Sequence, residues 1–287
     1  MVSDGPLDLL PAPELIARLI AGQEHVGTVV RAASGEIARA ADLMAVAFLA
    51  GGRIHLVGAG TSGRLAAMEA AELPGTFGIP VERVRARVAG AGTEQSAGAD
   101  DAEDDAELGR TDVAALGTTA GDVIVAVAAS GTTPYTLAAA DAARSAGATV
   151  IAVVNVQGSP LAALAEVAVE LPTGREVVIG STRLAAGTAQ KLALNTLTTA
   201  AMVRAGRVHD RLMVDVVPAN AKLVRRAADL VAEACGVPAE AAAAALERCG
   251  VNPRVAIVHL LTGLPPDEAA SRAAAHRTVR EAVGSAC

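Results

Sequence analysis

The chain of 287 residues is long enough to bury a large core, as one large domain or as a main domain with a smaller one. It is 52% hydrophobic but only 1% aromatic, so the core has to consist of Ala, Val and Leu. The net charge of −7 argues against nucleic acid as a partner, and no apolar run approaches the length of a membrane span.

The cysteines and the first residues of the chain bear on compartment and cofactors. Cys235, Cys249 and Cys287 are too few and too scattered for a disulfide framework or a metal site. The chain does not open with a basic region followed by an apolar run, which would indicate an export signal. We therefore expect reduced thiols, no metal, no membrane contact and a cytoplasmic location.

The hydrophobic pattern predicts helices first and an alternation of strands and helices afterwards. Residues 7–50 have apolar side chains at helical spacing, with a break at Ser34-Gly35. Apolar runs predict buried strands over 54–57, 84–88, 122–128, 149–154 and 167–171. Helices are predicted over 65–73 (ended by Pro74-Gly75), 98–109, 135–146 and 187–204. This order predicts an α/β fold, a doubly wound parallel sheet between two layers of helices with right-handed crossovers.

The pattern becomes purely helical after about residue 219. The predicted helices cover 223–235, 238–248, 253–261 and 266–283, with well-marked turns between them. The expected organisation is N-terminal helices over 1–50, an α/β domain over 51–218 and a small helical C-terminal domain over 219–287.

The turn after the first predicted strand has the composition of an anion site. The segment 58–64 contains three glycines, and Thr61 and Ser62 add hydroxyl donors. A strand that ends in such a turn and opens a helix collects unpaired backbone N–H groups and the positive end of the helix dipole. Phosphate is the ligand that this arrangement favours.

Two other interpretations of the same turn stay open. Gly58, Gly60 and Gly63 fit the dinucleotide fingerprint G-x-G-x-x-G, which requires an acidic residue at the end of the next strand. That strand ends in Ala89-Gly90, and Glu82 falls before it. The turn could also have a purely structural role.

Two more turns carry hydroxyl groups after predicted strands. Residues 129–134 form the second turn, and Ser181 and Thr182 belong to the third. Ser and Thr also favour helix N-caps, so each turn alone could be structural. Three such turns along one sheet edge favour a sugar phosphate as the ligand. The expected binding residues are Gly60, Thr61, Ser62, Gly63, Ser130, Gly131, Thr132, Thr133, Ser181 and Thr182.

Four segments together resemble the N-acetylmuramic acid 6-phosphate etherases of the sugar isomerase (SIS) superfamily. They are residues 58–65, 128–135, 180–191 and 212–216. The resemblance implies an SIS-type sheet and a lyase that removes D-lactate from a sugar phosphate to give N-acetylglucosamine 6-phosphate. It also implies a homodimer that needs no cofactor.

The resemblance assigns two catalytic glutamates. Glu72 matches the first motif in the segment 69–78, and Glu103 matches the second in the segment 98–104. Removing the C2 proton and protonating the departing ether oxygen requires two acid–base groups with different environments. Glu72 is expected to be the proton donor and Glu103 the second acid–base group.

The chain departs from the family pattern at positions that carry charge. The family usually has Arg at the position of Thr132 and Lys at that of Ala185, and Asp where Glu69 stands. Arg64, Arg183 or Lys191 could compensate for the missing cations. A non-catalytic sugar-phosphate sensor resembling the glucokinase regulatory protein and an aldose–ketose isomerase remain the alternative functions.

Overall fold

The computed structural model of the protein describes residues 6–91 and 101–284. The chain forms two compact units, residues 1–70 with 85–198 and residues 71–84 with 199–287. The boundary between the units falls inside two long helices, α4 (Gly60–Phe77) and α9 (Ala185–Arg204). The domain borders expected at residues 50 and 218 stay predictions.

The first unit contains a five-stranded sheet with the order β2-β1-β3-β4-β5. Its strands are β1 (Ile54–Gly58), β2 (Val84–Val88), β3 (Val123–Ala128), β4 (Thr149–Val154) and β5 (Val167–Glu170). The pairs β1–β3, β3–β4 and β4–β5 are parallel, with Ile54 opposite Val123 and Val123 opposite Thr149. The predicted strands are confirmed to within about a residue at each end.

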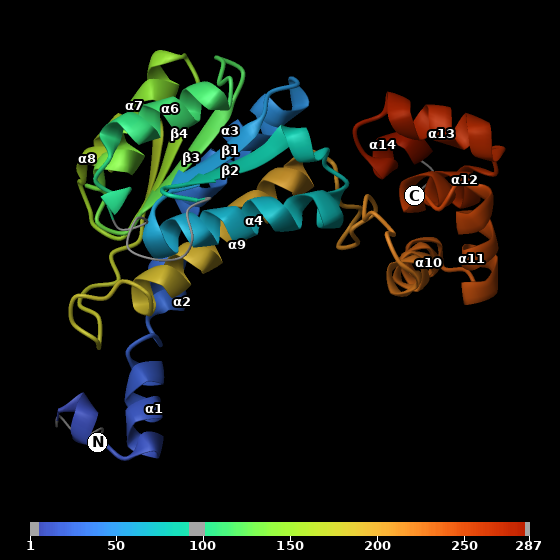
Figure 1. The fold of residues 1–287 in the computed structure, drawn as a ribbon. Helices are drawn as coiled ribbons and strands as arrows, with labels where there is room; N and C mark the ends of the chain where they lie inside the picture. Colours follow the sequence, from blue (N-terminus) through green and yellow to red (C-terminus); the bar gives the residue numbers. More distant parts are fainter. Residues whose placement is uncertain (1–5, 92–100, 285–287) are drawn as a thin grey trace. The chain divides into compact units, whose positions relative to one another are not determined.

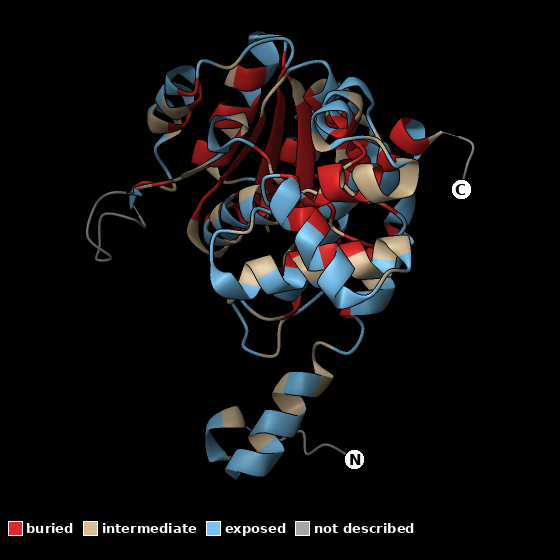
Figure 2. Ribbon diagram, turned by 90° about the vertical axis from the view of Figure 1, so that its right-hand side faces the viewer, coloured by how far each residue is buried: buried red, intermediate tan, exposed pale blue. Residues whose placement is uncertain are grey.

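Helices cover both faces of this sheet (Figure 1). Alternate residues of β3 and β4 pack with α6, α7 and α8 in one apolar cluster, which includes Ile124, Ala126 and Val150. Helix α3 contacts β3 and β5 on the opposite face of the sheet. Helices α4 and α9 lie on that same face (Figure 1). Figure 2 shows the strands as the most deeply buried part of the chain. The doubly wound α/β fold is confirmed.

The remaining helices of this unit are η1 (Leu7–Leu9), α1 (Ala12–Ala21), α2 (Val26–Ala32), α3 (Ser34–Leu49), α6 (Ala106–Ala115), α7 (Pro134–Ser145) and α8 (Pro160–Leu164). The break predicted at Ser34-Gly35 lies at Ala33, between α2 and α3. Within the described residues, no helix is long and apolar enough to cross a membrane.

Three predicted helix boundaries are wrong. Helix α4 begins at Gly60 and continues through Pro74 to Phe77, because Leu73 and Phe77 are buried and their packing outweighs the cost of an internal proline. The predicted helix 98–109 lies partly outside the described residues, and α6 begins only at Ala106, after Asp105 caps it. The predicted helix 266–283 is two helices, separated by the cap residue Thr278.

The second unit is helical. Its C-terminal part consists of α10 (Ala221–Cys235), α11 (Ala239–Arg248), α12 (Pro253–Thr262), α13 (Pro266–Ala275) and α14 (Val279–Val283), and η2 (Val81–Arg83) precedes β2. These helices share an apolar core with Val214 and Val216. Asp215 lies between those two residues and accepts two hydrogen bonds from Arg254, at 2.6 and 2.7 Å. The segment 212–216 therefore anchors the helices of this unit.

An ion pair between the partly exposed Arg53 and the buried Asp122 lies at the amino end of the sheet. The guanidinium of Arg53 donates to both oxygens of Asp122, at 3.2 and 2.7 Å, and Thr119 donates to the same carboxylate. Burial alone would raise the pKa of Asp122, but the hydrogen bonds from Arg53 and Thr119 hold it well below its ordinary value.

His55 lies beside this pair in the middle of β1. It is fully buried, and neither ring nitrogen has a hydrogen-bond partner among the described residues. Burial lowers the pKa of His55 to about 4, although the Asp122 carboxylate opposes the shift. The folded protein therefore holds a neutral imidazole inside its sheet at neutral pH.

We expect His55 to make the protein sensitive to acid. Between pH 6.5 and about 4 the unfolded chain binds a proton at His55 and the folded protein does not, so stability falls as the pH falls through this window. The loss attributable to His55 is about 3 kcal/mol, at about 1.4 kcal/mol per pKa unit. His55→Leu should flatten the curve there, measured by urea unfolding followed through Tyr135, the single tyrosine.

The quantity to compare between wild type and His55→Leu is the slope of unfolding free energy against pH. A change in packing at residue 55 shifts that free energy by the same amount at every pH. His276→Gln, a change at an exposed histidine, is the matched control and should keep the acid loss. An acid loss that is equally steep in His55→Leu and in the wild type would show that other groups cause it.

Candidate active site

The strand order has a switch point between β1 and β3. The chain leaves β1 toward β2 on one side of the sheet and continues from β3 toward β4 and β5 on the other. Gly58 and Val127 pair at the carboxyl ends of the two central strands. Ligands of open α/β sheets bind in the crevice at such a point. Two of the three predicted hydroxyl turns, those after Gly58 and after Ala128, begin there.

Glycines at the β1–α4 turn allow the helix to approach the strand closely. A Cβ at Gly58 would meet the carbonyl oxygen of Val127 at 2.8 Å, and a Cβ at Gly63 would meet the oxygen of Gly58 at 2.5 Å. Gly60 has a φ of +52°, which favours glycine. The Gly63 N–H donates to Ala59, so the unpaired donors of α4 are those that precede residue 63.

Glu103 lies against this turn. A Cβ at Gly60 would collide with the Glu103 carboxylate, so the carboxylate occupies the space that the missing side chain leaves. The side chain is half-buried, and the backbone oxygen of Glu103 accepts a hydrogen bond from the Tyr135 N–H at 3.0 Å. Glu103 is thus attached to the first turn of α7 and lies at the positive end of α4.

Tyr135 holds α6 and α7 together. Its hydroxyl donates to Asp112 of α6 at 2.6 Å, and burial raises its pKa. Gly109 of α6 has no space for a side chain, because a Cβ there would meet the Tyr135 carbonyl oxygen. The position of Glu103 therefore depends on tight contact between these two helices.

The β3–α7 turn presents hydroxyl groups. The Ser130 Oγ accepts from the N–H and the hydroxyl of Thr132, at 3.2 and 3.0 Å, and its own proton remains available to a ligand. Thr133 occupies the N-cap of α7, and its side chain makes no capping hydrogen bond. Gly131 has a φ of +65° and lies against Ser159. The turn can donate hydrogen bonds to phosphate oxygens.

The third hydroxyl turn differs from the other two. The Glu176 carboxylate accepts from the N–H groups of Ala185 and Ala186, both at 3.0 Å, and so caps the start of α9. The positive end of α9 already holds an internal anion. Ser181 and Thr182 precede it in a loop and line a hollow together with Thr61 of α4.

Sequence reasoning missed a buried amide pair that fixes this loop. Asn155, at the end of β4, donates to the carbonyl oxygen of Leu171, and its own oxygen accepts from Gln190 at 2.9 Å. Gln190 is 1% exposed and lies on α9. A polar residue directly after a fully buried strand was the available signal.

Glu72 lies on α4, in the part of the helix that belongs to the second unit, and its side chain is exposed. One turn earlier, Glu69 is 4% exposed and accepts from Lys191 at 3.2 Å and from Thr198 at 2.5 Å. Lys191 is therefore the partner of a buried carboxylate. Within the first unit, the structure brings Glu103 together with the glycines of the β1–α4 turn and with the β3–α7 turn.

The structure shows the surroundings of the two positions where the family pattern has a cation and this chain does not. Thr132 is exposed and donates to Ser130, and Ala185 is 1% exposed at the start of α9. The dinucleotide alternative gains no support, because β2 ends at Val88 and carries Arg85 and Arg87 rather than an acid.

Comparison with known proteins agrees with this arrangement. The family model described as "SIS domain" matches residues 21–155. A phosphoheptose isomerase from Francisella tularensis has a similar structure, with a TM-score of 0.54 and 19% identity over 68% of this chain and 100% of that one, which shows the fold alone.

Curated relatives match nearly the whole chain. "N-acetylmuramic acid 6-phosphate etherase 1" of Vibrio cholerae is 42% identical over 94% of this chain and 90% of its own length. The N-acetylmuramic acid 6-phosphate etherase of Deinococcus radiodurans is 47% identical over 93% of this chain and 87% of its own. At this identity and coverage, the chain belongs to the N-acetylmuramic acid 6-phosphate etherase family.

Proposed function

We propose that the protein is a lyase that cleaves the D-lactyl ether of N-acetylmuramic acid 6-phosphate. The products are N-acetylglucosamine 6-phosphate and D-lactate, and the reaction belongs to the breakdown of cell-wall amino sugars. The observation that carries the proposal is the 47% identity to an etherase over 93% of the chain. The two hydroxyl turns at the switch point of the sheet support a sugar phosphate as the substrate, because open α/β sheets bind ligands at such points.

The reaction proceeds by elimination followed by hydration. In the open-chain sugar the C1 aldehyde acidifies the C2 hydrogen, and a base removes it. The C3–O bond then breaks, and the lactate oxygen takes up a proton. Water adds at C3 of the resulting unsaturated aldehyde, and C2 regains a proton. Two carboxyl groups can divide these transfers, one as base and one as acid.

Glu103 and Glu72 take these roles in the proposal. The position of Glu103 at the switch point supports it as one acid–base group, because its carboxylate lies against Gly60 in the β1–α4 turn. Glu72 is assigned as proton donor to the ether oxygen on the family motif. Its exposed side chain is accessible to a substrate.

The phosphate is proposed to bind mainly at the β3–α7 turn. The Glu103 carboxylate already occupies part of the positive end of α4, so the hydroxyls of Ser130 and Thr133 carry most of the contact. Ser62, 8% exposed in the first turn of α4, completes the set. In the proposal, the other binding residues expected from the sequence line the rest of the site: Gly60, Thr61, Gly63, Gly131, Thr132, Ser181 and Thr182.

We further propose that the protein forms a homodimer and acts in the cytoplasm. Helix α1 supports the first point, because none of its residues is buried and Ile16 and Ile20 are 56% and 59% exposed. Such an apolar face is typical of a contact surface. The cytoplasmic location is proposed because three scattered cysteines are too few for a disulfide framework.

Replacing either glutamate should abolish most turnover without unfolding the protein. We expect Glu103→Gln and Glu72→Gln each to lower kcat by about two to four powers of ten, measured as D-lactate release. Glu107→Gln and Glu82→Gln, at neighbouring exposed carboxylates, are the matched controls and should retain activity. Normal lactate release by either site variant would remove that residue from the mechanism.

Binding should depend on the 6-phosphate. Ser130→Ala removes one donor to a charged group, so we expect KM to rise about 10- to 100-fold with kcat little changed. Unphosphorylated N-acetylmuramic acid should bind far more weakly than its phosphate, and it should respond little to the mutation. The control is Ser145→Ala at the end of α7. Equal calorimetric affinity for the two sugars would refute the phosphate site.

Isotopes distinguish elimination from displacement. In heavy-oxygen water the label should enter the sugar at O3 and leave lactate unlabelled, because lactate keeps the ether oxygen. In deuterated water the product should carry deuterium at C2. Labelled lactate with an unlabelled sugar would instead indicate attack at the lactyl carbon, and the two glutamates would need other roles.

A further inference from the structure

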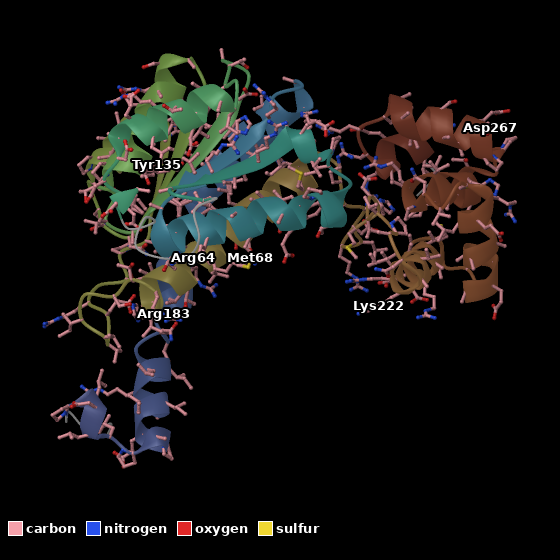
Figure 3. All side chains as sticks on the ribbon, viewed as in Figure 1. Arg64, Met68, Tyr135, Arg183, Lys222 and Asp267 are labelled. Atoms are coloured by element: carbon pink, nitrogen blue, oxygen red, sulfur yellow. The ribbon has the colours of Figure 1, made fainter. Side chains whose placement is uncertain are left out.

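A hollow of about 680 Å³ lies in the first unit between α4 and the loop that precedes α9. The side chains that α4 contributes recur at helical spacing and lie on one face of the helix: Thr61, Arg64, Leu65 and Met68. The loop contributes the segment 181–183. The volume of the hollow is in the range of small-molecule sites. Figure 3 shows Arg64 and Met68 on α4 and Arg183 on the loop.

Among the described residues, the charged side chains that line the hollow are all positive. They are Arg64 and Arg183, and both are exposed. No carboxylate of residues 6–91 or 101–284 forms a salt bridge with either guanidinium, and the Arg64 contact to the Thr61 hydroxyl, at 3.5 Å, is too long for a strong hydrogen bond. Two permanent positive charges that have no carboxylate partner in the described part of the chain favour an anionic ligand.

The hollow also has an apolar wall. Leu65 is half-buried and Met68 is 41% exposed on the same face of α4 as Arg64. Guanidinium groups bind carboxylates through two parallel N–H···O bonds, and a thioether and an isobutyl group contact methyl groups. The lining thus suits a short group that carries a carboxylate and a small apolar branch.

The hollow shares its wall with the candidate active site. Thr61 belongs to the β1–α4 turn, and a Cβ at Gly187, in the first turn of α9, would lie 3.5 Å from its methyl group. The hydroxyl turn after β3 is not part of this lining. A substrate with two anionic ends can therefore place its phosphate at that turn and its other anion here.

Resting on the function proposed above, we propose that Arg64 and Arg183 bind the carboxylate of the substrate's lactyl group and that Leu65 and Met68 contact its methyl. These residues determine specificity for a sugar that carries the lactyl ether. They supply two positive charges in a chain that has Thr132 and Ala185 where the family pattern has cations.

The first test compares the substrate with the product, which lacks the lactyl group. In Arg64→Gln and Arg183→Gln we expect KM for N-acetylmuramic acid 6-phosphate to rise about 10- to 100-fold. The inhibition constant of N-acetylglucosamine 6-phosphate should stay within about twofold. Arg144→Gln, at an exposed arginine of α7, is the control and should change neither. An equal loss for both sugars would show that the arginines bind the phosphate and would overturn the proposal.

The second test changes the ligand instead of the protein. An analogue of the substrate with a neutral lactamide group should bind the wild type about as weakly as the substrate binds Arg64→Gln or Arg183→Gln. The variant that carries both substitutions should bind the substrate and the lactamide analogue equally well. A wild type that binds both equally refutes the carboxylate site. Calorimetric binding is measured beside lactate release, so a protein that binds with these preferences but releases no lactate overturns the etherase function and leaves the lactyl site intact.

Discussion

The close approach of α4 to the end of β1 is the constraint on which the site depends. Gly58 and Gly63 allow the helix to begin directly at the strand, since a Cβ at either position would meet backbone. The positive end of α4 therefore lies at the switch point of the sheet. Gly60 leaves space there for the Glu103 carboxylate. One turn thus supplies both the electrostatic field and the position of the carboxylate that we propose as an acid–base group.

The sequence predicts the sheet well and the helix ends poorly, for physical reasons. Strands such as β3 and β4 are buried on both faces, so their residues are almost all apolar and their limits stand out. Helix ends depend on contacts that are distant in sequence. Helix α4 passes Pro74 because of what Leu73 and Phe77 pack against, which local propensity does not contain.

The candidate site follows from the sequence where one turn contains all of its parts, and it does not where several segments meet. The hydroxyls of Ser130 and Thr133 follow from the composition of one loop. The cap that Glu176 provides to α9 comes from nine residues upstream of Ala185, and the amide pair joins Asn155 to Gln190 across 35 positions. A local sequence pattern cannot reveal either contact, because the two partners lie far apart in the sequence.

The cap by Glu176 bears on position 185, where the family pattern has a lysine and this chain has Ala185. Ala185 is buried and gives its N–H to the Glu176 carboxylate, so the negative charge there already has a partner in the helix end. Arg64 and Arg183 instead project from the exposed side of the same region without a carboxylate partner among the described residues. The positive charge that faces the hollow therefore comes from these two side chains.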